Sequence, residues 1–241
     1  LSGRQRSVAK RGSRGARREE AKASRIRQRP TEMTESGTNP LVIRKLEFLG
    51  GMASAGGWRP ESELQEIAFA GRSNVGKSSL LNRLVQRRSF ARVSRTPGRT
   101  REINFFRVND HFVLADLPGY GYAKISKEKK ADWRPLIEGY LRSTASLSGV
   151  VQLLDIRREA SDDDVAMLDY LAELELPTVV VLTKIDKISR TAADERARGI
   201  METLSLPREQ VIPFSSSTGE GRDELAAAVA SLVDVTRGED N

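Results

Sequence analysis

Short apolar runs alternate with amphipathic stretches along most of this 241-residue chain. Residues 150–156 and 178–182 are mostly aliphatic, which is typical of strands buried on both faces of a parallel sheet. Glycine and proline gather between residues 50 and 60, which indicates a loop. Similar apolar runs predict further strands at residues 41–49, 66–70, 103–108, 112–115 and 211–214.

Apolar residues recur at helical spacing between these strands, which predicts helices at residues 77–87, 163–174, 192–204 and 224–235. Residues 133–141 carry one more such stripe, which is more typical of a buried helix face than of a binding surface. Pro135 interrupts that stripe, so either Asp132 caps a helix that starts there or the helix is kinked.

Asn109, Asp110 and His111 separate two of the predicted strands, and so short a turn forces an antiparallel hairpin. His111 is the only histidine, so it has no histidine partner for a metal site and no triad. Elsewhere strands and helices alternate, which predicts an α/β fold. We expect a doubly wound, mostly parallel sheet with one antiparallel edge strand and with helices on both faces.

A glycine-rich loop follows the predicted strand at residues 66–70 and leads into the helix that begins near Lys77. Its glycines allow backbone amides to approach phosphate oxygens closely, at the positive end of that helix. Lys77 would reach the β and γ phosphates, and the Ser78 hydroxyl would bind magnesium. The predicted phosphate-binding loop consists of Gly71, Arg72, Ser73, Asn74, Val75, Gly76, Lys77, Ser78 and Ser79.

A second motif, Asp116-Leu117-Pro118-Gly119, follows the predicted strand at residues 112–115. The carboxyl ends of strands are where open α/β sheets bind ligands, so Asp116 could hold magnesium through a water molecule. The Gly119 N–H could meet the γ phosphate in a segment that rearranges when this phosphate leaves. Alone the motif would be a plain turn, but downstream of a phosphate-binding loop it predicts a nucleotide switch.

A third motif, Thr183-Lys184-Ile185-Asp186, ends the next apolar run. A carboxylate accepts hydrogen bonds from both N1–H and the exocyclic amine of guanine, whereas N1 of adenine is itself an acceptor. Asp186 therefore favours guanine and disfavours an ATPase. Lys184 could lie along the base with its ammonium in water. Small residues that could approach the base O6 follow at Ser215, Ser216 and Ser217.

The sequence blocks GRSNVGKSSLLN, TPGRTREINFF, ADLPGYGYAK, TKID and SSSTGEG together resemble the translation-factor-like GTPases, and in detail the EngB (YihA/YsxC) family of ribosome-biogenesis GTP-binding proteins. The resemblance runs from about residue 43 to residue 235. It implies that Thr100 is the switch threonine on magnesium, a choice over Thr96 that spacing alone does not make. It also implies nucleotide contacts from Gly98, Arg99, Arg101 and Glu102.

By this resemblance, Lys77, Thr100, Asp116 and Gly119 are the catalytic residues, and Ser78 and Thr100 bind the metal. Many GTPases place a glutamine after the glycine of the second motif, where this chain has Tyr120, so intrinsic hydrolysis should be slow. Asn74 matches an asparagine of related GTPases that use potassium as a second cation. Its alternative role is a hydrogen bond that braces the loop.

Charge is distributed unevenly along the chain. Its net charge is +7, but residues 1–30 alone carry +9 and the remainder carries −2. Because this arginine-rich tail has few large apolar residues, we expect residues 1–40 to be disordered and residues 41–241 to form a single GTPase domain. The tail is either a solubilising extension, an arm for RNA phosphates, or, less in keeping with Glu19 and Glu20, a transit peptide.

Composition limits the cellular context. The chain has no cysteine, which excludes disulfides and thiolate metal sites, and no apolar run approaches the roughly 18 residues that span a bilayer. From these limits together with the motifs and the resemblance, we expect a monomeric bacterial-type cytoplasmic protein that binds GTP, GDP and magnesium, with potassium as a candidate second cation.

The function predicted from these features and the resemblance is that of a slow, magnesium-dependent GTPase switch. The family implies a role in assembly of the large ribosomal subunit, with a ribosomal particle or rRNA as partner. It also implies a need for the protein in cell division and septation, which failed ribosome assembly would explain indirectly. The alternative is a GTP-gated binding scaffold in which hydrolysis is incidental.

Overall fold

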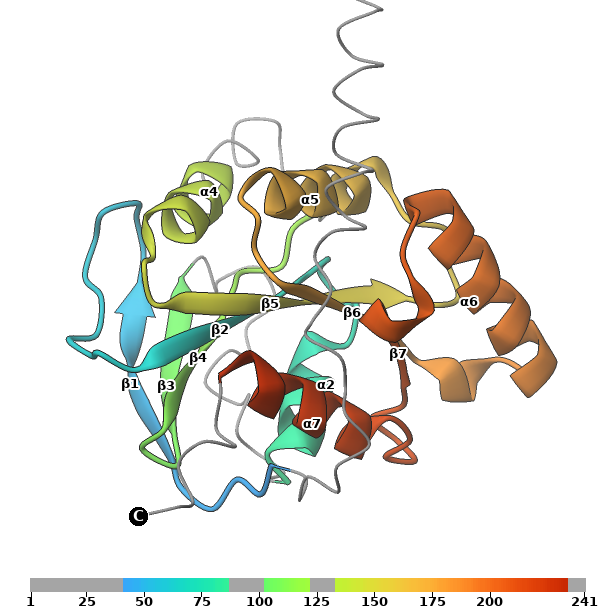
Figure 1. The fold of residues 1–241 in the computed structure, drawn as a ribbon, viewed down its shortest axis with the longest axis horizontal. Helices are drawn as coiled ribbons and strands as arrows, with labels where there is room; N and C mark the ends of the chain where they lie inside the picture. Colours follow the sequence, from blue (N-terminus) through green and yellow to red (C-terminus); the bar gives the residue numbers. More distant parts are fainter. Residues whose placement is uncertain (1–40, 87–101, 122–132, 234–241) are drawn as a thin grey trace, which may run out of the picture.

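The computed structural model describes residues 41–86, 102–121 and 133–233 of the chain. These residues form a seven-stranded sheet in the order β1-β3-β4-β2-β5-β6-β7, with helices on both faces (Figure 1). The strands are β1 (Leu46–Met52), β2 (Gln65–Gly71), β3 (Ile103–Val108), β4 (Phe112–Asp116), β5 (Leu147–Asp155), β6 (Thr178–Thr183) and β7 (Val211–Phe214). The predicted tail, residues 1–40, lies outside the described residues.

The helices are α2 (Lys77–Leu84), α4 (Trp133–Ser143), α5 (Asp162–Glu173), α6 (Arg190–Leu204) and α7 (Arg222–Leu232), with short 3₁₀ turns η2 (Ile185–Lys187) and η3 (Arg208–Gln210). Helices α2 and α7 cover one face of the sheet, and α4 and α5 cover the other (Figure 1). Helix α6 packs on α5 and on the β5–β6 side of the sheet.

The sheet is buried on both faces because alternate residues of each central strand enter different cores. In β2, Ile67 and Phe69 pack with α2 and α7, whereas Ala68 and Ala70 pack toward α4. All four side chains are at most 1 % exposed. Burial on both faces of the sheet therefore explains the continuous apolar runs of the sequence, as expected.

The order of strands confirms the doubly wound α/β fold. From β2 the chain builds outward to β4 on one side and later to β5, β6 and β7 on the other, and all these neighbours pair in parallel. Among the described strands, β3 runs against its neighbours β4 and β1 at one edge of the sheet. The direction of winding reverses at β2, which is where such sheets bind ligands.

Strand β1 differs from its prediction at both ends, because it begins at Leu46 rather than residue 41 and continues to Met52. The predicted loop from residue 50 is thus wrong at its start. Gly50 and Gly51 pair with β3, and a register shift between Phe48 and Gly50 accommodates a Gly50 φ of 149°. Glycine lowers strand propensity, but here the pairing with β3 decides.

Two smaller predictions concern helix ends. Helix α2 ends at Leu84 rather than near residue 87. In the described part of the chain, α4 begins at Trp133, so Pro135 lies in the first helical turn, where the missing N–H has no intrahelical acceptor to lose. Asp132, the predicted cap, is outside the described residues. The hairpin turn is confirmed, with Asn109 and Asp110 at φ values of 51° and 61°.

Among the described residues, no helix combines the length and apolar character needed to cross a membrane.

Candidate nucleotide site

The predicted motifs meet at the carboxyl ends of the parallel strands β2, β4, β5 and β6, which lie together on one side of the sheet. Gly71 ends β2, Asp116 ends β4, Asp155 ends β5 and Thr183 ends β6. Three of these four positions lie in motifs singled out from the sequence. Asp155 was missed, although an acidic residue at the carboxyl end of a buried strand is the same signal that identified Asp116.

The backbone shape of the phosphate-binding loop depends on the residue types at three of its positions. Asn74 and Gly76 have positive φ values of 66° and 109°, and Gly76 precedes the first residue of α2. A Cβ on Gly71 would come within 2.9 Å of Val75 Cγ1 and 3.0 Å of Leu153 Cβ, so a larger residue would open the loop. Among the described residues no side chain caps the N-terminus of α2, so its first amides can bind an anion.

Lys77 and Asp116 face each other across the site, and Lys77 Nζ donates a hydrogen bond to Asp116 Oδ1. Both side chains are largely buried, so this pair places one positive and one negative charge beside the loop. Ser78 and Ser79 lie in the first turn of α2, where both are exposed. The structure therefore places Lys77 and Asp116 in contact beside the phosphate-binding loop, and Ser78 directly follows Lys77 at the start of α2.

The described residues contain no cluster of three or more His, Cys, Asp or Glu side chains that could hold a metal unaided. Magnesium commonly binds through one or two protein oxygens together with substrate phosphates and water. The Ser78 hydroxyl and the Asp116 carboxylate are hard oxygen donors of that kind. The donor set fits magnesium delivered with a nucleotide.

Gly119 is packed tightly against the phosphate-binding loop. A Cβ at this position would lie 3.1 Å from the N, Cα and Oγ atoms of Ser73. The Ser73 hydroxyl donates to the Gly119 carbonyl at 3.1 Å, and Ser73 N donates to Tyr120 O at 2.8 Å. Leu117 and Pro118, between Asp116 and Gly119, are buried. The second motif is thus docked on the first.

The base-recognition candidates also come together. Ser215 Oγ donates to Asp186 Oδ1 at 2.8 Å and accepts from the backbone N–H groups of Ser217 and Thr218 at 3.2 and 3.1 Å. The hydrogen bond from Ser215, with Lys187 Nζ 3.0 Å away, holds the pKa of the Asp186 carboxyl below its usual value. Asp186 is therefore ionised, as the recognition of two guanine donors requires. Ser216 is partly buried in the same loop.

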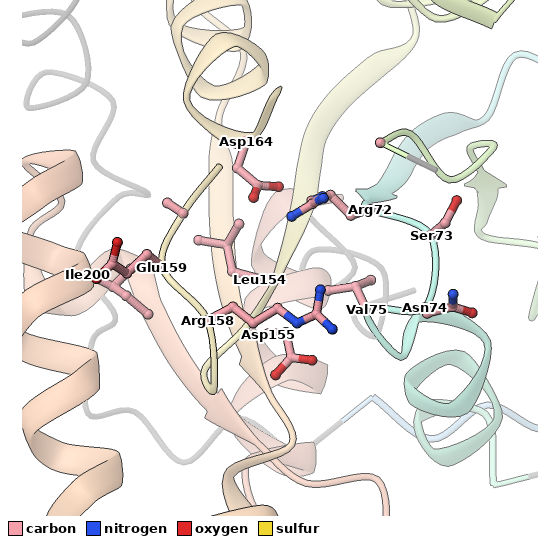
Figure 2. A pocket seen from close by; sticks show the side chains of 12 residues that line it. Arg72, Ser73, Asn74, Val75, Leu154, Asp155, Arg158, Glu159, Asp164 and Ile200 are labelled. Atoms are coloured by element: carbon pink, nitrogen blue, oxygen red, sulfur yellow. The ribbon is translucent and has the colours of Figure 1, made fainter. Parts of the chain in front are cut away.

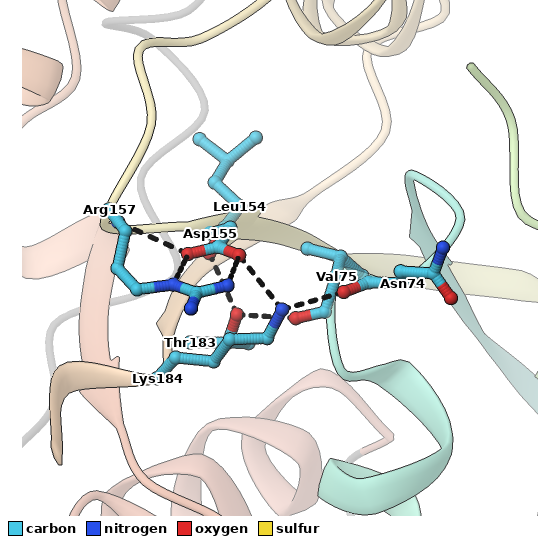
Figure 3. Close-up of polar contacts among 7 residues, drawn as sticks. All are labelled: Asn74, Val75, Leu154, Asp155, Arg157, Thr183 and Lys184. Carbon is cyan, nitrogen blue, oxygen red and sulfur yellow. Dashed lines mark hydrogen bonds and ion pairs between the residues drawn. The ribbon is translucent and has the colours of Figure 1, made fainter. Parts of the chain in front are cut away.

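Lys184 ties the third motif to the phosphate-binding loop (Figure 3). Its Nζ donates to Asn74 O at 2.6 Å and to Asp155 Oδ2 at 2.8 Å. Its stem passes over Gly76, where an added Cβ would lie 3.6 Å from Lys184 Cε. The adjacent Thr183 hydroxyl is 2.7 Å from Val75 O. Ile185, the next residue, is buried beneath the site.

Asp155 is the centre of this network. Arg157 donates to its two carboxylate oxygens through Nε at 2.9 Å and Nη2 at 2.7 Å. Burial by itself would raise the pKa of the Asp155 carboxyl, but the hydrogen bonds from Arg157 and Lys184 outweigh burial and hold that pKa far below its usual range. Asp155 therefore remains an anion that orients Lys184.

A cavity of about 300 Å³ lies beside the phosphate-binding loop (Figure 2). Its twelve lining residues come from that loop, from the end of β5 and the connection to α5, and from Gly121, Asp164 and Ile200. Neither Lys77 nor Asp186 lines it, so this cavity borders the candidate nucleotide site rather than containing it.

Several predicted site residues cannot be placed. Thr100 lies outside the described residues, and so do Gly98, Arg99 and Arg101. Glu102 is exposed just before β3, where its carboxylate would come within 2.5 Å of a Cβ added to Gly51. Glu102 thus lies against β1, and its predicted contact with the nucleotide stays a prediction.

Comparison with known proteins gives consistent relatives. The model of a protein family described as a 50S ribosome-binding GTPase matches residues 66–184. A protein of Gemmatimonas aurantiaca named probable GTP-binding protein EngB is 62% identical over 193 residues, which cover 80% of this chain and 95% of that protein. A Geobacter protein of the same name is 46% identical over 199 residues, or 83% of this chain and 92% of its own.

A solved structure of a probable GTP-binding protein EngB aligns with a TM-score of 0.60 at 28% identity, over 70% of this chain and 99% of that one. The predicted resemblance is therefore confirmed by sequence and by fold. With four fifths of its length matched at these identities, and with the motifs of a guanine-nucleotide site gathered at one sheet edge, the chain belongs to the EngB family of GTP-binding proteins and is a GTPase.

Proposed function

We propose that this GTPase is a magnesium-dependent switch that hydrolyses GTP slowly and acts in assembly of the large ribosomal subunit. The observation that carries the switch proposal is the docking of Gly119 on Ser73, beside the Lys77–Asp116 pair. A γ phosphate bound by this loop would meet the Gly119 amide, so its loss on hydrolysis would be sensed there.

Each residue has a separate task in the proposed reaction. Lys77 neutralises charge on the β and γ phosphates, and the free amides at the start of α2 surround them. Ser78, Thr100 and, through water, Asp116 would hold magnesium, which would supply positive charge beside the phosphates. Asp186 accepts the two guanine donors while Lys184 lies against the base.

Slow intrinsic hydrolysis is supported by the position of Tyr120. Its side chain is 1 % exposed and lies in the core, so it does not replace a glutamine that orients the attacking water. Acceleration would then have to come from a partner or from potassium near Asn74. In the described part of the chain no hydrogen bond involves the Asn74 side chain, so the bracing alternative for this residue has no support.

The ribosomal role is supported by membership of the EngB family and by the description of the matching family model. We propose the large-subunit particle or its rRNA as the partner. A division or septation defect on loss of the protein would follow indirectly from impaired ribosome assembly. The cytoplasm is the compartment in which this partner assembles in bacteria.

Magnesium dependence is tested by titrating the ion against binding of fluorescent GTP and GDP. Ser78→Ala should weaken the magnesium dependence for both nucleotides. Thr100→Ala should weaken it for GTP more than for GDP, because the switch threonine meets magnesium only in the GTP state. Equal effects of Thr100→Ala on the two nucleotides would remove Thr100 from the switch role.

A GTP-gated scaffold with incidental hydrolysis is the second candidate, favoured by the buried Tyr120. Ribosomal particles should be captured with a non-hydrolysable GTP analogue and released with GDP under either proposal. Measuring GTP turnover with purified particles present distinguishes the switch from the scaffold. Particles that accelerate hydrolysis indicate a switch, and particles that bind without accelerating it indicate a scaffold.

A further inference from the structure

Tyr120, the residue directly after Gly119, is anchored by its hydroxyl group in the core. The hydroxyl donates to Asp164 Oδ1 at 2.9 Å and accepts a hydrogen bond from Gln152 Nε2. Asp164 belongs to α5 and is 4 % exposed, and Gln152 belongs to β5 and is fully buried. One hydroxyl therefore connects the second motif to a helix and a central strand.

The acceptor of this hydrogen bond is itself fixed. Ser161 donates to Asp164 Oδ2 through its backbone N at 2.9 Å and its Oγ at 2.7 Å. Asp164 N in turn donates to Ser161 Oγ at 3.3 Å, which completes a capping box at the start of α5. Tyr120 is thus bonded to a rigid helix end rather than to a movable side chain.

The backbone of Tyr120 is fixed to the phosphate-binding loop at the same time. Tyr120 O accepts from Ser73 N at 2.8 Å, and Tyr120 N donates to Gly71 O at 3.4 Å. Gly119 lies between these contacts and packs against Ser73, where an added Cβ would lie 3.1 Å from the Ser73 backbone. The direction of the Gly119 amide therefore depends on where Tyr120 is held.

Burial, together with the neighbouring Asp164 carboxylate, raises the pKa of Tyr120 well above its usual value. The hydroxyl stays protonated throughout the physiological range and is always able to donate. A donor bonded to an ionised acceptor makes a stronger hydrogen bond than a neutral pair does.

We propose that Tyr120 is a positioning residue, which through its hydrogen bond to Asp164 holds the Gly119 amide where the γ phosphate of GTP binds. This inference rests on the proposed contact between Gly119 and that phosphate. GDP lacks the γ phosphate and so makes no contact with the Gly119 amide. The Tyr120–Asp164 bond therefore favours GTP over GDP without touching either nucleotide.

The direct test is Tyr120→Phe, which keeps the buried ring and removes the hydroxyl. Affinities for a non-hydrolysable GTP analogue and for GDP are measured by calorimetry at fixed magnesium. We expect the analogue to bind roughly three- to tenfold more weakly, with GDP affinity unchanged. This is less than the full effect of losing a hydrogen bond to a charged group, because the hydroxyl acts on the phosphate only through Gly119.

Tyr170→Phe is a matched control. Tyr170 also lies on α5, and its hydroxyl donates to Glu138 O at 3.2 Å rather than to Asp164. Its loss should lower the melting temperature without changing the ratio of the two affinities. If Tyr120→Phe also leaves the ratio of the GTP-analogue and GDP affinities unchanged, the proposal is overturned, whatever happens to the melting temperature.

Asp164→Asn provides a second variant should Tyr120→Phe not fold. It removes the acceptor charge while Tyr120 stays intact, so the ratio should move in the same direction by a smaller factor. An unchanged ratio in Asp164→Asn would also count against the inference. If the parent protein bound neither nucleotide, the proposed function would fail as well; parental binding with an unaltered ratio would end only the role of Tyr120.

Discussion

At the scale of single residues, guanine selection depends on a carboxylate that Ser215 holds in place. We predict that Asp186→Asn lowers GTP affinity by about two orders of magnitude, because two charge-assisted hydrogen bonds to the base are lost. Preference should move toward xanthosine triphosphate, whose base offers an acceptor where guanine has its amine. Competition between the two triphosphates for the variant measures this change.

Lys187→Gln is the control for this experiment, since Lys187 is 3.0 Å from the same carboxylate but largely exposed. It should leave base preference unchanged. A variant Asp186→Asn that still prefers GTP over xanthosine triphosphate by the parental factor would contradict the assignment.

A second residue-scale prediction concerns Asp155, which holds Lys184 over Gly76. Asp155→Asn should weaken GTP, inosine triphosphate and xanthosine triphosphate by a similar factor of roughly five to ten, since the lysine stem contacts any purine face. Binding of the three nucleotides by calorimetry tests this. Loss confined to GTP would mean that Asp155 acts through Asp186 rather than through Lys184.

The same carboxylate predicts a pH dependence of stability. The pKa of Asp155 is lowered on folding, so its contribution is complete above the unfolded-state value of about 3.9 and is lost as the pH falls toward the folded-state value. The difference in unfolding free energy between the parent and Asp155→Asn should be constant from pH 8 to pH 5 and shrink below about pH 4. Urea unfolding at several pH values measures it.

At the scale of elements, the phosphate-binding loop combines a left-handed Asn74 with an uncapped helix. If the Asn74 carboxamide binds potassium, GTP turnover should be faster in potassium than in sodium at equal ionic strength. Asn74→Gly should abolish the difference, and glycine is the suitable replacement because it accepts a φ of 66° without strain. Equal rates of the parent in the two salts would exclude the potassium role.

The elements also show why some boundaries could not be read from the sequence. Apolar periodicity located β2 through β7, since each is buried on one or both faces, although β5 begins at Leu147 rather than residue 150. The C-terminal end of strand β1 was misplaced because glycines at positions 50 and 51 are weak strand formers that pair only because β3 lies beside them. Pairing partners are distant in sequence, so no local pattern reports them.

At the scale of the whole molecule, charge is divided between a basic N-terminal segment and a slightly acidic remainder. We predict that deleting residues 1–30 weakens binding to ribosomal particles and flattens its dependence on salt, because fewer counterions are released from RNA. Nucleotide affinity and hydrolysis should not change, since the candidate site begins at Gly71. Sedimentation with particles over a range of salt concentrations measures both quantities.

A truncated protein with the parental affinity and salt slope would show that the segment does not contact RNA. Recognition of the particle would then belong to residues 31–241 alone.

The sequence alone determined the fold class, the three nucleotide motifs and the preference for guanine, because these depend on local composition and on residue types at short spacing. Tertiary structure decided how the motifs are joined. Asp155 meets Lys184 only because β5 and β6 are adjacent, and Tyr120 meets Asp164 only because α5 packs over the carboxyl end of β4 and β5. The first pair is 29 positions apart in the sequence and the second pair is 44. Strand order and layer packing bring these residues together, and no pattern along the chain reports it.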